Sequence, residues 1–193
     1  MGTTSTSHIS IQDYLRMEAS AEVRHEFHRG EVYAMAGGTF NHSVLGTNIT
    51  TELSLAARKN GCTTFNGDMR IRIDSMNCFL YPEVSVVCGE AESSQHDPNT
   101  IINPSLIVEV LSESTEAYDR GEKFFLYQQL ESFREYVLID QHKPLVSHFF
   151  KHDDGIWEFK NVYGLDQLLR IEILKVDIPL ATIFRDTRDL KTL

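Results

Sequence analysis

The spacing of hydrophobic residues changes several times along this chain, and each change marks an expected element. Ser10 precedes a run to about Ala19 with apolar positions at helical spacing, which predicts a short capped helix. After Asn41, a longer apolar stripe continues to about Asn60, which predicts the first long helix. Between these helices, two short alternating runs meet at Arg29-Gly30 and indicate a hairpin.

The rest of the chain is rich in predicted strands. Asp119, with an acid three residues later, predicts the start of another helix with Lys123 in its first turn. The Asp-Gly turn within residues 152–155 predicts a carboxyl-terminal hairpin. These elements favour an α/β fold, an α+β mixed sheet with flanking helices. The predicted strands cover residues 63–65, 69–73, 79–87, 106–111, 134–140, 145–151 and 156–162, and the segments 168–173 and 178–184 complete the core.

Length and composition predict a single domain. The 193 residues, 41% of them hydrophobic, suffice for one sizeable core over residues 10–193, after a disordered tail at 1–9. Because no apolar run approaches a membrane span and no secretory pattern opens the chain, we expect a cytoplasmic protein without a membrane partner. The net charge of −10 opposes nucleic-acid binding, although a local basic groove or a bound metal can serve within an acidic protein.

The three cysteines predict neither a disulfide framework nor a zinc site. Cys62, Cys78 and Cys88 are odd in number, and none stands in a CxxC pair. We therefore expect all three to be small buried hydrophobic residues.

Two acids stand where apolar side chains are expected. Glu83 follows Pro82 at the end of a strand-like run, and Glu109 lies within the apolar run Leu106–Leu111. A buried carboxylate is costly unless a cation or hydrogen bonds compensate, and a divalent metal is a common compensation. Glu83, Glu109 and the backbone carbonyl of Val110 would supply the oxygen ligands that such an ion prefers. Lys123 would then stabilise negative charge developing on a phosphate.

A structural interpretation of the same residues is equally open at this point. Glu83 can be a solvated strand end, and Glu109 can form a salt bridge with Lys123 or Arg70. Spacing alone does not choose between these two interpretations.

Several blocks of sequence resemble a known family. They begin with Arg-Gly-Glu-Val-Tyr-Ala-Met at residues 29–35, and the most specific are Val-Glu-Val-Leu-Ser at 108–112 and Asp-Arg-Gly-Glu-Lys at 119–123. Together they resemble the Uma-two family of restriction-endonuclease-like proteins, of the PD-(D/E)xK nuclease superfamily, from about Ile11 to Phe184. The resemblance implies a restriction-endonuclease-like core with a divalent-metal site, here Mg²⁺ or Mn²⁺, and DNA as the partner.

The chain departs from the family pattern at two positions. Glu83 stands where the family has Asp, and Leu111 occupies the lysine position of the E-x-K triplet. The resemblance implies that Lys123, on the next helix, takes over the role of that lysine. It also implies a supporting role for Glu31, which matches the early acid of the family, although a surface glutamate beside a turn is an equal alternative.

Four histidines carry weaker predictions. His42, at the start of the long helix, is a candidate for positioning water or phosphate, and a structural role is the alternative. His142, His148 and His152 have no metal-binding spacing, and we expect them on the surface.

Two functions follow. The first is a metal-dependent endonuclease that hydrolyses DNA phosphodiester bonds with catalytic residues Glu83, Glu109 and Lys123. The second is a catalytically inactive relative that keeps the fold as a binding or assembly module. A homodimer is expected by analogy, because cutting two strands is easiest with two sites.

Overall fold

The computed structural model describes residues 8–35 and 37–191, and its helices are short apart from one. Ser10 caps the first helix, as predicted, by accepting a hydrogen bond from the Asp13 amide. The long helix begins at Phe40, with Thr39 as its cap. The helices are α1 (Ile11–Glu18), α2 (Phe40–Lys59), α3 (Glu116–Arg120), α4 (Glu122–Tyr127) and α5 (Leu180–Ile183), with a 3₁₀ turn at Asp74–Met76.

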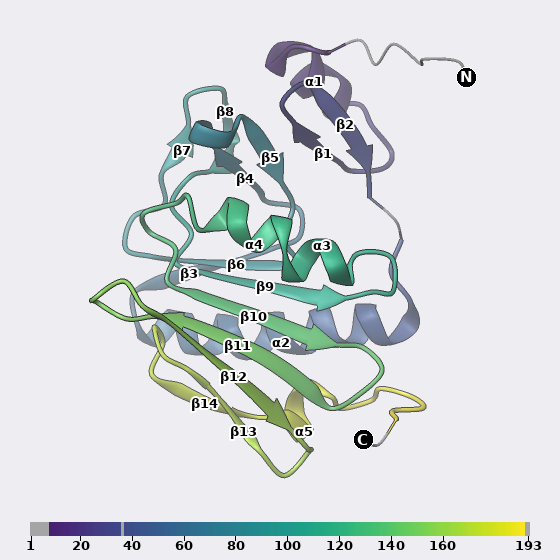
Figure 1. The fold of residues 1–193 in the computed structure, drawn as a ribbon, viewed down its shortest axis with the longest axis vertical. Coiled ribbons are helices and arrows are strands. Elements are labelled where there is room, and N and C mark those ends of the chain that lie inside the picture. Colours follow the sequence, from purple (N-terminus) through teal and green to yellow (C-terminus); the bar gives the residue numbers. More distant parts are fainter. Residues whose placement is uncertain (1–7, 36, 192–193) are drawn as a thin grey trace.

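Two six-stranded mixed sheets and a two-stranded hairpin form the β structure (Figure 1). One sheet has the order β2-β1-β5-β4-β8-β7, and the other β12-β11-β10-β9-β6-β3. Each contains one parallel pair, β4 with β8 and β9 with β10. The strands are β1 (His25–His28), β2 (Glu31–Ala34), β3 (Cys62–Asn66), β4 (Arg70–Ile73), β5 (Cys78–Leu80), β6 (Val84–Cys88), β7 (Ser93–Ser94), β8 (Asp97–Ile101), β9 (Leu106–Leu111), β10 (Glu135–Asp140), β11 (Leu145–Lys151), β12 (Trp157–Tyr163), β13 (Leu168–Ile171) and β14 (Val176–Pro179).

The second sheet separates two hydrophobic cores. Helix α2 packs its predicted apolar stripe, including Leu45, Ile49 and Leu53, against one face of this sheet. Helix α4 contributes Leu126 and Tyr127 to the core on the other face. Alternation along β9 sends Val108 and Val110 to the first core, and Ile107 and Leu111 to the second. The fold class expected from the sequence, a mixed sheet with flanking helices and hairpins near both ends, is confirmed.

Two predicted elements differ from the structure. The expected strand 79–87 is divided, because β5 ends at Leu80 and β6 begins at Val84, with Pro82 between them. Proline has no amide hydrogen, so it cannot donate to the ladder at this point. Asp119 does not begin a helix, since it is buried inside α3 and Gly121 separates α3 from α4.

The prediction for the cysteines is wrong for two of them. Cys62 and Cys88 stand directly opposite each other in the antiparallel pair β3 and β6, and they form a disulfide. Cys78 is free and buried, as expected. The error arose because strand register, rather than spacing in the sequence, brings the first two sulfurs together.

The amino-terminal segment before α1 is only partly described. Residues 1–7 of the predicted tail lie outside the described residues, whereas the Ile9 amide donates to the Gly30 carbonyl at 3.0 Å. None of the helices in the described part of the chain is long and apolar enough to cross a membrane.

Candidate active site

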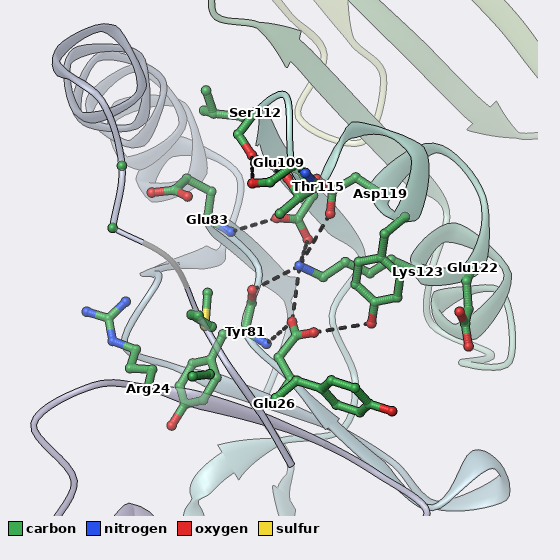
Figure 2. A pocket seen from close by; sticks show the side chains of 18 of the residues that line it. Arg24, Glu26, Tyr81, Glu83, Glu109, Ser112, Thr115, Asp119, Glu122 and Lys123 are labelled. Atoms are coloured by element: carbon green, nitrogen blue, oxygen red, sulfur yellow. Dashed lines mark hydrogen bonds and ion pairs between the residues drawn. The ribbon is translucent and has the colours of Figure 1, made fainter. Parts of the chain in front are cut away.

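A broad cleft of about 1940 Å³ opens beside β9, α3 and the β1–β2 hairpin. Figure 2 shows side chains from these elements converging on its floor. Glu83, Glu109 and Lys123 all line this cleft, as do the supporting candidates Glu31 and His42. The fold therefore brings the residues singled out in the sequence to one region, although not all of their side chains meet.

Glu109 is nearly enclosed, with 5% exposure, and its carboxylate is held by three donors. Its Oε1 forms an ion pair with Lys123 Nζ at 2.9 Å and accepts a hydrogen bond from the Tyr127 hydroxyl at 3.1 Å. Its Oε2 accepts a hydrogen bond from the backbone amide of Glu83 at 3.3 Å. Strand alternation puts this side chain on the same face as Ile107 and Leu111, the side of the sheet that α4 covers. Glu109 thus connects β9 with α4 and with the segment between β5 and β6.

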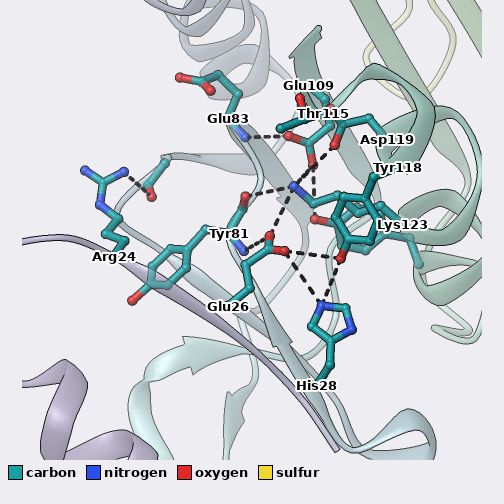
Figure 3. Close-up of polar contacts among 12 residues, drawn as sticks. Arg24, Glu26, His28, Tyr81, Glu83, Glu109, Thr115, Tyr118, Asp119 and Lys123 are labelled. Atoms are coloured by element: carbon teal, nitrogen blue, oxygen red, sulfur yellow. Dashed lines mark hydrogen bonds and ion pairs between the residues drawn. The ribbon is translucent and has the colours of Figure 1, made fainter. Parts of the chain in front are cut away.

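Lys123 lies at the centre of three carboxylates and is 4% exposed. Besides Glu109, its ammonium is 3.2 Å from Glu26 Oε1 and 3.7 Å from Asp119 Oδ1, and it donates to the Tyr81 carbonyl at 3.1 Å. Figure 3 shows these contacts radiating from Nζ. An ammonium with this many acceptors is fixed in position, because moving it would leave buried carboxylates unpaired.

Sequence reasoning missed two carboxylates of this cluster, Glu26 and Asp119, the second of which it assigned only to a helix start. Glu26 comes from β1 and accepts hydrogen bonds from the Tyr81 amide at 3.2 Å and the Tyr118 hydroxyl at 3.2 Å. The Tyr118 hydroxyl also lies 2.8 Å from His28 Nε2, so these side chains form a triangle beside the lysine (Figure 3). Unlike Glu109, which stands out within an apolar run, Glu26 lies between His25 and Phe27 in a mostly polar strand, so the sequence carried no comparable signal.

The buried charges shift one another's pKa values. Burial raises the pKa of Glu109 to about 8, against the opposing influence of the Lys123 ammonium. Burial would also raise the pKa of Glu26, but Lys123, His28 and the Tyr81 amide lower it to about 2. Burial alone would lower the pKa of Lys123, whereas the carboxylates of Glu109, Glu26 and Asp119 together hold it above its ordinary value. The ammonium and the Glu26 carboxylate therefore stay charged, whereas burial raises the pKa of Glu109 into the range near neutral pH and also raises the pKa of Asp119.

The Glu83 side chain occupies a separate position. Its carboxylate lies 3.5 Å from His42 Nε2 and beside Gly46 of α2, and Figure 2 shows it turned away from Lys123. A Cβ at Gly46 would lie 3.1 Å from Glu83 Oε1, so the absent side chain leaves room for the carboxylate. Only the backbone amide of Glu83 contacts Glu109.

The remaining predicted residues are also placed. Val110 lies in β9 and lines the cleft. Glu31 accepts a hydrogen bond from Tyr33 on the same strand, and no contact between it and Lys123 is present among the described residues. His148 is buried against Glu135 at 2.6 Å, so the expectation that it lies on the surface is wrong. The sequence carried no sign of that pairing, which depends on the register of β10 and β11.

The oxygen donors match a hard divalent cation in chemistry but are not assembled around a common point. No group of three His, Cys, Asp or Glu side chains in residues 8–35 and 37–191 is arranged to hold a metal ion. Glu109 Oε2 accepts one hydrogen bond and retains lone-pair capacity, and the Glu83 side chain is 31% exposed. The Glu83 carboxylate would have to move from its place beside His42 toward Glu109 for the two acids to share one ion.

Glu109 is buried on the central strand β9, and Lys123, which contacts it, lies on α4, the second helix after that strand. The chain matches Uma2, described as "Putative restriction endonuclease", over residues 11–182, and it belongs to that family of restriction-endonuclease-like proteins. The resemblance inferred from the sequence blocks is thereby confirmed.

Two curated relatives and one solved structure are similar to this chain. The chain is 36% identical over 160 residues to the Synechocystis protein named "Uncharacterized protein slr1290", covering 83% of each chain. It is 31% identical over 176 residues to "Uncharacterized protein sll1609" of the same organism, covering 91% of this chain and 99% of the relative. A crystal structure from Anabaena variabilis, titled as a putative nuclease belonging to DUF820, superposes with a TM-score of 0.73. That match is 14% identical and covers 91% of this chain and 97% of the other, so it shows a shared fold.

Proposed function

We propose that this protein is a metal-dependent nuclease that hydrolyses DNA phosphodiester bonds in the cleft. The observation that carries the proposal is the Lys123 ammonium, fixed beside Glu109 and Glu26 in a buried cluster that borders an open cleft. Buried groups with strongly shifted pKa values in a cleft are typical of catalytic sites. Membership of the Uma2 family points to the same reaction.

Glu109, Glu83 and the Val110 carbonyl are the groups that would hold Mg²⁺ or Mn²⁺. If bound there, the ion would supply Lewis acidity and an acidified water molecule. Glu109 releases its proton as it becomes a ligand, because an ionised carboxylate is the binding form. The Glu83 carboxylate lies 3.5 Å from His42 Nε2 in the wall of the cleft, and it would have to turn toward Glu109 to share the ion.

Lys123 contributes positive charge where the phosphate becomes more negative. Glu26 remains ionised because its pKa is about 2, so it keeps the ammonium protonated and in place when Glu109 changes partner. Glu26 therefore acts as a positioning residue for Lys123. A preorganised charge of this kind needs no rearrangement at the moment of reaction.

The test is DNA cleavage by purified protein with Mg²⁺ or Mn²⁺, using single-stranded, duplex and overhang substrates. Glu109→Gln and Lys123→Met should each slow cutting by about 100-fold or more, the usual effect of removing a group that stabilises transition-state charge. Glu158→Gln and Lys160→Met make the same changes at exposed positions on β12 and should cut like the wild type. Unchanged cutting by both cleft variants would reject the proposed site.

A second function is favoured by the closed ion pair between Lys123 and Glu109. If the cluster serves only to hold α4 against β9, the protein is a binding or assembly module. Thermal unfolding with and without Mg²⁺ separates the two functions. A nuclease site should give metal-dependent stabilisation that Glu109→Gln abolishes, and a structural cluster should give none.

The proposed oligomer is a homodimer, because cutting both strands of a duplex uses two sites. Light scattering after size-exclusion chromatography measures this directly. A monomeric mass would contradict the homodimer. The proposal would then be limited to cutting one strand at a time.

A further inference from the structure

We propose, resting on the nuclease function above, that the cleft binds single-stranded DNA with a base stacked on Tyr33 and a second contact at Phe125. Both rings line the cleft, Tyr33 from β2 and Phe125 from α4. They are 51% and 53% exposed, so both rings are accessible to a ligand in the cleft. Every DNA base has a flat face that can stack on such rings, irrespective of sequence.

A row of rings connects Tyr33 with the buried cluster. The centroids of Tyr33 and His28 are 5.6 Å apart, and those of His28 and Tyr118 are 5.9 Å apart. Lys123 Nζ in turn lies 5.9 Å from the centre of the Tyr118 ring. A base on Tyr33 would therefore lie at one end of a short row whose other end is the lysine assigned to the phosphate.

The geometry leaves a face of Tyr33 free. Its ring meets His28 at 86°, so the two rings are edge to face and not stacked. Whichever of the two rings presents its edge, His28 covers at most one face of the Tyr33 ring. The half-exposed side chain agrees with an open face, and the Tyr33 hydroxyl is tied to Glu31.

The charges around the cleft disfavour a duplex. The described residues that line it include eight acids but only three lysines or arginines. Of these three cations, Lys123 is buried among carboxylates, and Arg24 already bonds Asp68 and the Gly67 carbonyl. Duplex binding depends on neutralising several phosphates, whereas single strands gain much of their affinity from base stacking.

The test measures binding without cutting. Metal-free protein in EDTA, at low ionic strength, is titrated with a single-stranded oligonucleotide containing 2-aminopurine, whose fluorescence reports stacking, and with a blunt duplex of the same sequence. The single strand should bind more tightly. Its affinity should fall with salt with a log–log slope of about 1.4 or less, since two exposed arginines contribute about 0.7 each.

Variants then assign the contact. Tyr33→Ala should weaken binding by roughly fivefold or more and restore 2-aminopurine fluorescence, which corresponds to losing one stacked base. Tyr33→Phe should bind like the wild type, because the ring remains. Phe159→Ala removes a ring of equal exposure on β12, outside the cleft, and should change nothing. Thermal unfolding of each variant confirms that it is folded.

The outcomes separate this inference from the nuclease proposal. Tighter binding of the duplex, or equal binding by wild type and Tyr33→Ala, would overturn the stacking site even if the protein cuts DNA. Tyr33-dependent binding of the single strand by a protein that never cuts would support the stacking site and defeat the nuclease proposal. Where cutting occurs, Tyr33→Ala should raise KM more than it lowers kcat.

Discussion

Two glutamates are buried on neighbouring parallel strands, and their surroundings differ. Glu109 on β9 is 5% exposed, and Glu135 on β10 is 0% exposed. The Glu135 carboxylate accepts the backbone amides of Glu172 at 2.8 Å and Ile173 at 3.1 Å, with His148 at 2.6 Å. Two of the three donors to Glu109 are instead the side chains of Lys123 and Tyr127, and Glu109 lines the cleft.

The difference shows that burial alone does not identify a functional acid. Backbone amides are fixed by the fold, so the Glu135 carboxylate has a single set of partners. Through them it connects the segment after β13 to the main sheet. Glu109 lines the cleft, which gives a ligand access to its carboxylate, and Lys123 keeps its contacts with Glu26 and the Tyr81 carbonyl if Glu109 takes a new partner. The type of donor and the presence of an opening distinguish the two sites.

The largest expected effect on stability comes from Glu135→Ala. The change leaves two buried amides and His148 without their acceptor, and it should lower the free energy of unfolding by about 3–5 kcal/mol. Urea denaturation measures the loss, and cutting by the protein that remains folded should be unchanged. A loss below about 1 kcal/mol, within the range of an exposed ion pair, would remove the structural role assigned to Glu135.

The pH dependence of stability should separate the glutamates of the cleft. Glu109 has its folded pKa raised from 4.5 to about 8, so its contribution to stability is present below about pH 4.5 and is lost as pH rises toward 8. The folded pKa of Glu26 is lowered to about 2, so this residue contributes to stability above about pH 4.5, and the contribution is lost as pH falls toward 2. Between pH 5 and pH 9, the free energy of unfolding should fall less steeply with pH in Glu109→Gln than in the wild type. Parallel curves for the two proteins would contradict the assignment.

An intermediate effect is expected from Glu26→Gln. The amide keeps the shape but removes one charge beside Lys123, which should cost about 1.5–3 kcal/mol, the range for a hydrogen bond to a charged group. Cutting should slow as well, because the ammonium is less firmly held. Glu131→Gln makes the same change at an exposed position outside the cleft and should leave both stability and cutting unaltered. Equal behaviour of the two variants would remove the positioning role of Glu26.

The smallest effect is expected from Gly46→Ala. Alanine favours the helix by roughly 1 kcal/mol over glycine, but its Cβ would lie 3.1 Å from Glu83 Oε1. Because a flexible carboxylate can move, stability should change by about 1 kcal/mol or less, while Glu83 shifts away from His42. The NMR signals of the His42 ring report that shift, with His96 as an internal reference. Unchanged His42 signals would mean that Glu83 does not depend on the space beside Gly46.

The local features of the fold were predictable from the sequence, and so was part of the site. The Ser10 cap, the stripe on α2 and the hairpin turn at Arg29-Gly30 are encoded by neighbouring residues. Glu109 and Lys123 could be selected because an acid within an apolar strand is conspicuous. Their contact at 2.9 Å matches both interpretations left open by spacing, a salt bridge and a catalytic pair.

The features that were missed depend on contacts between distant segments. Glu26 meets Lys123 only because the β1–β2 hairpin pairs with β5, and Cys62 meets Cys88 through the register of β3 and β6. Strands β7 and β8 went unpredicted because β7 has only two residues and β8 is mostly polar. Glu83 lies in the break between β5 and β6 at Pro82, so the alternation of side chains along a strand does not predict its direction.

Calorimetric titration of Mn²⁺ from pH 6 to pH 9 tests the central claim most directly, in the wild type, Glu109→Gln and Glu135→Gln. Metal binding must displace the proton from Glu109, so the affinity of the wild type should rise by about tenfold per pH unit up to about pH 8 and then level off. Glu135→Gln should follow the same curve, and Glu109→Gln should bind weakly at every pH. Equal, pH-independent affinity in all three proteins would contradict the account.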